Sequence, residues 1–183
     1  RHVYGVDVGY GQVAWSVRQD ARVTLRERTN LRHLAPTDLY PENQPYPDLG
    51  VVDVSFISLT KVLPALWQLL RSPREVVLLV KPQFEVGRDR VGKNGVVRSA
   101  QDQAEAILQV LNAAIALGWQ YRGVTWSPLP GPAGNIEYLL WLQEPADGGS
   151  SSSPATIASP DLNTLKQLTQ RAQQELAQGG RGA

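Results

Sequence analysis

Short runs of apolar and β-branched residues recur along the chain and predict six strands. The most apolar run, EVVLLV at 75–80, is continuous rather than alternating, which is typical of a parallel strand covered on both faces. A proline- and glycine-rich segment at 127–134 separates the last two runs. The predicted strands span residues 3–8, 22–26, 49–56, 75–80, 120–126 and 135–142.

Apolar residues at helical spacing predict helices after most of these strands. The clearest helix spans 99–118, because Ser99 with Asp102 resembles an N-terminal capping box and Gly118 suits a C-terminal cap. A second helix is expected before residue 70. Proline is tolerated only in the first turn of a helix, so Pro64 indicates that this helix begins near Lys61. Further helices are expected at 12–18 and 162–176, and loops at 35–50 and 84–97.

The alternation of strands and helices predicts an α/β fold, a doubly wound, mostly parallel sheet with helices on both faces. Residues 1–144 are expected to form this domain, residues 145–160 a low-complexity linker, and residues 161–178 an amphipathic C-terminal helix. The chain from 179 onward should be disordered. Ligands of such sheets bind at the carboxyl ends of the strands, so polar residues there are the candidates for chemistry.

Composition narrows the classes of function. The 183 residues include no cysteine, which excludes disulfides and thiolate metal sites, and the two histidines form no metal-ligand cluster. No apolar run approaches the roughly 20 residues that span a bilayer, and nothing resembles a signal peptide, so we expect a cytoplasmic protein with no membrane partner. The absence of methionine indicates that the chain does not begin where its gene begins.

The charge is unevenly distributed although the net charge is only +1. Residues 71–98 hold seven basic and three acidic side chains, a local charge of 7 − 3 = +4, and a second basic stretch spans 22–32. Either stretch taken alone is ordinary solvated surface. Two such stretches beside one site would suit a polyanion.

Two unlike charges end two successive predicted strands. Asp53 interrupts a β-branched run and Lys81 follows EVVLLV, and a charge in such a place is costly unless it is paired. The two side chains should therefore lie close together, either as a buried structural ion pair or as a lysine able to act as a base. Glu137, at the start of the last strand, would complete a triad of alternating charge.

Two further segments suggest nucleotide chemistry. Asp7 ends the first strand, where a carboxylate can accept hydrogen bonds from ribose hydroxyls, or can simply cap the Gly9–Gly11 turn. The segment 87–94 nearly matches a phosphate-binding loop, but Asn94 stands where serine or threonine must bind magnesium, and no strand directly precedes it. We therefore reject a phosphate-binding loop there.

Several segments, in this order and spacing, resemble the TlyA (hemolysin A-like) rRNA methyltransferases, relatives of the FtsJ ribose methyltransferases. The resemblance runs from Val3 to about Leu142. The segments are VDVGYGQ (6–12), ERTN (27–30), VDVSFISL (52–59), VKPQFE (80–85), VGKNGVVR (91–98) and GNIE (134–137).

The resemblance implies a methyl transfer from S-adenosylmethionine to the 2'-hydroxyl of a ribose in ribosomal RNA. It implies that Lys81 is the general base, that Asp53 holds it and also contacts the cofactor, and that Glu137 orients the set. Asp7 matches the cofactor-ribose position and Asn30 the adenine position, where relatives often carry an acid.

Parts of the family pattern are missing from this sequence. The first catalytic lysine, the glycine-rich loop and the small N-terminal RNA-binding domain all belong upstream of Val3, so the resemblance implies a partial domain without its first strand. We expect ribosomal RNA or ribosomal subunits as partners. The alternative is a catalytically decayed RNA- or ribosome-binding module of the same family. The target nucleotide, the oligomeric state and the role of the terminal helix are left open.

Overall fold

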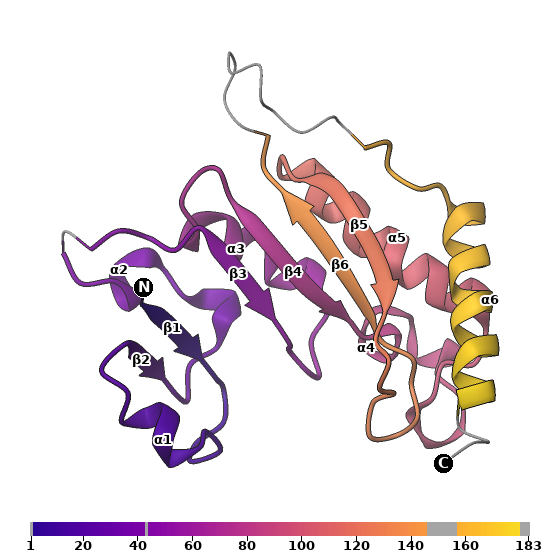
Figure 1. Ribbon diagram of the computed structural model, residues 1–183, viewed down its shortest axis with the longest axis horizontal. Helices are drawn as coiled ribbons and strands as arrows, with labels where there is room; N and C mark the ends of the chain where they lie inside the picture. The colour runs from indigo at the N-terminus through magenta and orange to yellow at the C-terminus, as the bar shows by residue number, and fades with distance from the viewer. Residues whose placement is uncertain (1, 43, 146–156, 180–183) are drawn as a thin grey trace.

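The computed structural model describes residues 2–42, 44–145 and 157–179. Within them the strands form two sheets (Figure 1). In the smaller sheet, β1 (Val3–Val6) pairs with β2 (Val23–Arg26) in parallel. The larger sheet has the order β3-β4-β6-β5, with bounds Leu49–Val52, Glu75–Val80, Tyr138–Gln143 and Gln120–Trp126.

The predicted α/β class is confirmed, and the larger sheet is mixed. Strands β3 and β4 are parallel, whereas β6 runs antiparallel to both β4 and β5. The short connection 127–137 explains this direction, because a parallel return needs a crossover of a dozen or more residues, usually a helix. The last strand therefore folds back as a hairpin and enters the sheet between its two neighbours.

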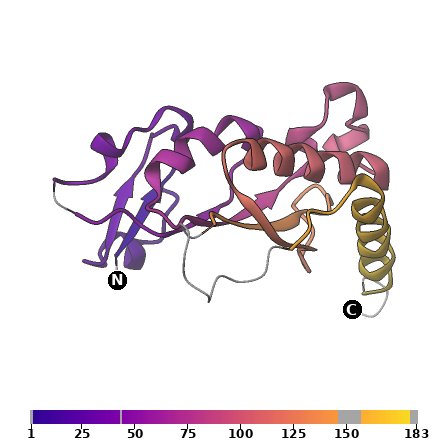
Figure 2. The same ribbon diagram turned by 90° about the horizontal axis from the view of Figure 1, so that it is seen from above.

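Helices α3 (Leu63–Leu69) and α5 (Ala100–Ala116) cover the same face of the larger sheet (Figure 2). Alternate residues of β4 point into this core, and Val76, Leu78 and Val80 are fully buried. We expected helices on both faces, but among the described residues the opposite face of this sheet presents apolar side chains to solvent. Val51, for example, is 76% exposed.

Local signals set the ends of α5 as expected. The Ser99 hydroxyl accepts a hydrogen bond from the Asp102 amide at 3.2 Å, and Gly118 follows the helix with φ of +107°. Other elements are shorter than predicted or lie in predicted loops. They are α1 (Trp15–Arg18), α2 (Pro36–Leu39), α4 (Pro82–Glu85) and the 3-10 turns Leu31–His33, Leu59–Lys61, Arg88–Arg90 and Lys93–Gly95.

Helix α3 joins the two sheets. Its residues Ala65 and Leu69 pack with Leu34, Leu39 and Tyr40 from the segment between β2 and β3. The Tyr40 hydroxyl donates a hydrogen bond to the Leu69 carbonyl at 2.7 Å. The smaller sheet is thus attached to the larger one through side-chain packing rather than through a shared strand.

The C-terminal helix α6 (Leu162–Gly179) packs on α5 and β5 (Figure 1). Leu165, Thr169 and Ala172 are fully buried there, and the Thr169 hydroxyl donates to the Ala100 carbonyl at 2.8 Å. Gly179, expected to begin a disordered tail, is instead the last residue of α6. Residues 146–156 of the expected linker and 180–183 of the expected tail lie outside the described residues. None of the helices in the described part of the chain is long and apolar enough to cross a membrane.

Candidate active site

The charges that end β3 and β4 meet at one edge of the larger sheet. The strands are parallel, so Asp53 and Lys81 follow them on the same side. The Lys81 Nζ lies 2.6 Å from Asp53 Oδ1, as the sequence predicted. The lysine side chain is 12% exposed and the aspartate side chain 65%. The lysine side chain is thus enclosed, while the aspartate side chain is open to a ligand.

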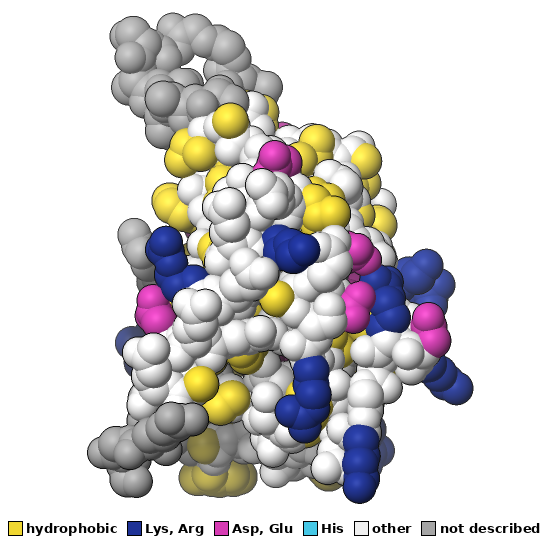
Figure 3. All heavy atoms as spheres, turned by 90° about the vertical axis from the view of Figure 1, so that its right-hand side faces the viewer, with side chains coloured by type: hydrophobic (Ala, Val, Ile, Leu, Met, Phe, Trp, Pro, Cys, Tyr) yellow, Lys and Arg dark blue, Asp and Glu magenta, His cyan; other side chains and the backbone are white. Residues whose placement is uncertain are grey.

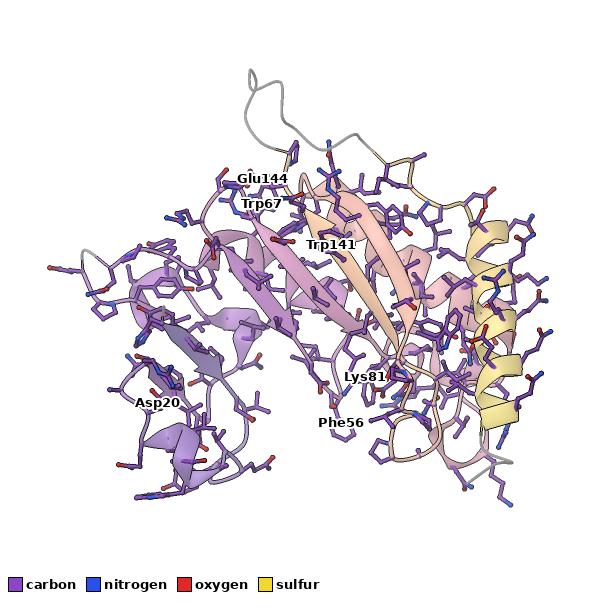
Figure 4. The ribbon with its side chains drawn as sticks, in the orientation of Figure 1. Asp20, Phe56, Trp67, Lys81, Trp141 and Glu144 are labelled. Carbon is purple, nitrogen blue, oxygen red and sulfur yellow. The ribbon has the colours of Figure 1, made fainter. Side chains whose placement is uncertain are left out.

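Lys81 has a second partner in the same loop as Asp53. Its Nζ donates a hydrogen bond to Ser55 Oγ at 3.0 Å. Two acceptors from one loop fix the direction of the amine. Lys81 and Phe56 lie at the same end of the sheet, opposite the end that carries Trp67, Trp141 and Glu144 (Figure 4).

The antiparallel pairing of β4 and β6 brings Glu137 to this edge. Val80 pairs with Tyr138, so the residue before β6 is level with Lys81, the residue after β4. Glu137 is buried and its Oε1 accepts a hydrogen bond from Gln83 Nε2 at 3.3 Å. All three residues of the predicted triad therefore gather at one edge of the sheet.

Hydrogen bonds and ring packing join the segment after β3 to the segment after β4, beside the triad. The Glu85 carboxylate accepts hydrogen bonds from Ser58 Oγ at 2.6 Å and from the Leu59 amide at 2.8 Å. The rings of Phe56 and Phe84 lie 5.2 Å apart, so the loop after β3 and helix α4 after β4 each contribute one aromatic and one polar residue. The loop that carries Asp53 is thereby held to the loop that carries Lys81.

Burial dominates the electrostatics of Glu85. Loss of solvent raises the pKa of its carboxyl group above the ordinary value, and the hydrogen bonds from Ser58 and Leu59 oppose this rise. The carboxyl group is nevertheless fully paired, so it acts as a structural clamp at the base of the two loops.

Sequence reasoning missed Phe56, Gln83 and Glu85. Phe56 was assigned to a strand, but it lies in the loop after β3, is 92% exposed and has φ of 63°. A non-glycine residue in this left-handed region is strained, and such residues cluster at functional sites. Two signals in the sequence could have found them: these residues lie within four positions of Asp53 or Lys81, and they belong to the segments 52–59 and 80–85 that carry the family resemblance.

Asp7 and Asn30 lie together at the carboxyl edge of the smaller sheet. The Thr29 amide donates to the Asp7 carbonyl at 2.9 Å, which joins the two loops. Asp7 Oδ1 accepts from the Gly9 amide at 2.6 Å, and Asn30 Oδ1 accepts from the Arg32 amide at 3.0 Å. Both side chains thus have a local capping role, which the sequence allowed for Asp7.

Each of these capping hydrogen bonds uses only one atom of the Asp7 or Asn30 side chain. The second carboxylate oxygen of Asp7 and the amide nitrogen of Asn30 are not used by these bonds. Asn30 also lines a hollow of about 370 Å³ together with Arg26, Arg28 and His33. An acceptor and a donor of these kinds suit the hydroxyls and ring nitrogens of a nucleoside.

The segment 87–98 forms a basic border beside the triad. Asn135 is buried and holds this segment, accepting from the Val97 amide at 3.0 Å and donating to the Gly95 carbonyl at 2.9 Å. Its exposed side chains include Arg88, Lys93 and Arg98. On the face that α6 covers, the charged side chains visible towards the lower edge are Lys and Arg (Figure 3).

Comparisons with known proteins place the chain among methyltransferases. A family model described as FtsJ-like methyltransferase matches residues 1–144. The chain is 50% identical over 151 residues to the 16S/23S rRNA (cytidine-2'-O)-methyltransferase TlyA of Mycobacterium tuberculosis, covering 82% of this chain and 55% of that protein. It is 45% identical over 145 residues to YqxC of Bacillus subtilis, described as a candidate rRNA methyltransferase, covering 79% of this chain and 50% of the relative.

A solved structure agrees with these relatives. The candidate hemolysin of Streptococcus thermophilus superposes with a TM-score of 0.84 at 36% identity, covering 98% of this chain and 61% of that one. The chain spans about half the length of the curated relatives it matches. On the strength of the family model and of the edge that gathers Asp53, Lys81 and Glu137, the chain belongs to the FtsJ-like methyltransferase family.

Proposed function

We propose that this chain is the catalytic part of an S-adenosylmethionine-dependent methyltransferase that acts on a ribose 2'-hydroxyl of ribosomal RNA. The observation that carries the proposal is the Asp53–Lys81 pair beside Glu137, in a chain half identical to a named rRNA cytidine-2'-O-methyltransferase. Within it, residues 1–144 form the methyltransferase part, residues 145–160 the linker and residues 161–178 a helix that packs on the domain.

Lys81 is the general base in this mechanism. A ribose hydroxyl is a poor nucleophile while it keeps its proton, and a base within hydrogen-bond reach removes that proton as the new O–C bond forms. Lys81 must be a free amine to accept it. Asp53, 2.6 Å away, then stabilises the ammonium that results, and Ser55 keeps Nζ pointed in one direction.

Glu137 completes the set from the neighbouring strand. Its carboxylate lies level with Lys81 in the strand register and is held by Gln83, from the same loop as the lysine. A second carboxylate at this edge adds negative potential where the ammonium develops, which favours the proton transfer.

Asp7 and Asn30 would hold the nucleoside end of the cofactor. The unused Asp7 oxygen can accept from a ribose hydroxyl, and the unused Asn30 amide can donate to an adenine nitrogen. The exposed carboxylate of Asp53 would contact the cofactor from the other sheet. When bound, S-adenosylmethionine supplies an electrophilic methyl group.

The rim of the site suits RNA. Phe56 is 92% exposed and backed by Phe84, which makes it a platform for a base, and such stacking contributes roughly 1–3 kcal/mol. The exposed basic side chains of 88–98, which follow Phe84 in the chain, could supply phosphate contacts. An unstacked nucleotide could thus be held with its ribose near Lys81.

The test uses the full-length protein with tritiated S-adenosylmethionine and unmodified ribosomal RNA, followed by digestion to nucleosides. We expect label on a ribose oxygen, and a loss of roughly 100-fold or more in Lys81→Ala, the typical contribution of a general base. Lys61→Ala, which removes an exposed lysine, is the matched control. Label on a base, or a folded protein that binds RNA but labels none, would refute the proposal and favour a non-catalytic RNA-binding module.

The cofactor residues have a separate test by calorimetric titration of S-adenosylmethionine. Asp7→Ala should weaken binding, because an acceptor for the ribose is lost, while Asp20→Ala should not. Asp20 pairs with Arg22 in an exposed turn of the same sheet, which makes it a suitable control. Equal affinity of the two variants would contradict the assigned role of Asp7.

A further inference from the structure

The carboxylate of Glu137 is confined on two sides. On one side Gln83 Nε2 donates to Oε1 at 3.3 Å. On the other side lies Gly131, at which an added Cβ would stand 2.6 Å from the same Oε1 and 3.1 Å from Cδ. Real Cβ atoms essentially never come within 3.0 Å of another heavy atom in this way, so Glu137 occupies the space that a side chain at 131 would need.

The backbone does not explain the glycine at 131. Gly134, in the same turn, has φ of +91°, which disfavours other residues, but Gly131 is not in that region. Gly131 donates to the Asn135 carbonyl and accepts from the Gly134 amide, both at 2.8 Å, and any residue with a backbone amide could make these bonds. A larger residue at 131 would therefore displace the carboxylate of Glu137 from its place.

Gln83 is also poorly explained by stability. Its Oε1 is buried without a hydrogen-bond partner among the described residues, although its Nε2 is paired with Glu137. A buried acceptor without a partner is unfavourable for folding. An apolar side chain of similar size would avoid this penalty, so the benefit of Gln83 lies in what its amide nitrogen holds.

We propose that Gly131 and Gln83 are positioning residues that fix the Glu137 carboxylate beside Lys81. The inference rests on the proposed function, because it assumes that Glu137 takes part in the methyl transfer. Gln83 lies two residues after Lys81 and Gly131 six before Glu137, so the pair connects the two strands that carry these groups. Gly131 leaves the space for the carboxylate, and Gln83 sets its direction.

The experiment compares Gly131→Ala, Glu137→Ala and the double variant in the full-length methyltransferase, with kcat and KM for ribosomal RNA measured separately. We expect Gly131→Ala to lower kcat at least tenfold with KM little changed, and the double variant to be no slower than Glu137→Ala. Gly123→Ala is the matched control, because its Cβ would meet only Trp141 at 3.9 Å. Wild-type kcat in Gly131→Ala, or losses that multiply in the double variant, would overturn the proposal.

Gln83→Leu provides a second test that does not depend on the folding of Gly131→Ala. A purely structural role predicts a lower Tm. Gln83→Leu removes one unpaired buried oxygen but also leaves the buried Glu137 carboxylate without its amide partner, so the two effects oppose each other and Tm should change little. The positioning role predicts a lower kcat at temperatures well below that Tm, with no further loss when Gln83→Leu is combined with Glu137→Ala. If Glu137→Ala keeps full activity while Lys81→Ala loses it, the assignment of Glu137 in the proposed function fails. If Glu137→Ala loses activity and both positioning variants keep it, the positioning proposal alone fails.

Discussion

Removal of the Glu85 carboxylate should loosen both loops of the site. In Glu85→Ala, the Leu59 amide loses its acceptor at 2.8 Å and Ser58 Oγ loses its acceptor at 2.6 Å. Leu59 is 1% exposed, so its amide has little access to bulk water. A hydrogen bond to a charged group contributes about 1.5–3 kcal/mol, and a buried amide without a partner costs about 1–3 kcal/mol. We expect a loss of about 3 kcal/mol in the free energy of unfolding, or roughly 6–12 °C in Tm.

The pH dependence gives the sharper test of the same residue. Burial raises the pKa of Glu85 above its ordinary value of 4.5, so the folded state holds the proton more tightly than the unfolded state. The stability that this group contributes is fully present below pH 4.5 and is lost as pH rises through the raised pKa. The Tm of the wild type relative to Glu85→Gln should therefore fall from acid to neutral pH.

The assay is thermal unfolding followed by circular dichroism between pH 4 and about 8, a window set by the usual range of carboxyl pKa values with room for the rise. Glu42→Gln, an exposed residue, is the control and should stay within about 0.5 kcal/mol of wild type at every pH. A Tm difference between wild type and Glu85→Gln that is flat or grows with pH would refute the reasoning, as would a Glu85→Ala protein as stable as the wild type.

Two other variants test the packing of the domain. Gly118→Ala should lower the free energy of unfolding by about 1–3 kcal/mol in urea titrations, because φ is +107° and the new Cβ would lie 2.8 Å from Trp67 Cη2; a midpoint equal to that of Gly123→Ala would contradict this. Thr169→Val should cost about 1 kcal/mol by removing the buried hydrogen bond to Ala100, and should speed hydrogen exchange in α6. Unchanged exchange there would mean that this bond does not hold the helix.

Much of the fold was predictable because its strongest signals are local. The run at 75–80 is β4 residue for residue, and the caps Ser99 and Gly118 bound α5 as expected. The antiparallel direction of β6 was not predicted, because it depends on how the short connection between β5 and β6 packs against the rest of the sheet. The sequence also did not predict that one face of the larger sheet is left uncovered by the described helices, since apolar residues on a covered and an uncovered face look the same in sequence.

The site shows the same division. The Asp53–Lys81 contact was predictable, because two unlike charges that end successive parallel strands must meet at one edge. The positions of Gly131 and Gln83 were not, because their closeness to Glu137 follows from the turn 131–135 and from the β4–β6 register, which are tertiary features. Phe56 was hidden inside an apolar run that ends as a strand four residues earlier than its pattern implies.

The place of β6 in the larger sheet has a consequence for the order of folding. Among the described residues it is the last strand in sequence, yet it lies between β4 and β5, which has no other strand partner there. During synthesis β5 therefore has no strand to pair with until residues 138–143 have left the ribosome. Contacts between segments far apart in sequence form slowly, because the chain entropy of the intervening loop is lost first. Glu137 comes level with Lys81 in that same late step, so completion of the sheet also assembles the candidate active site.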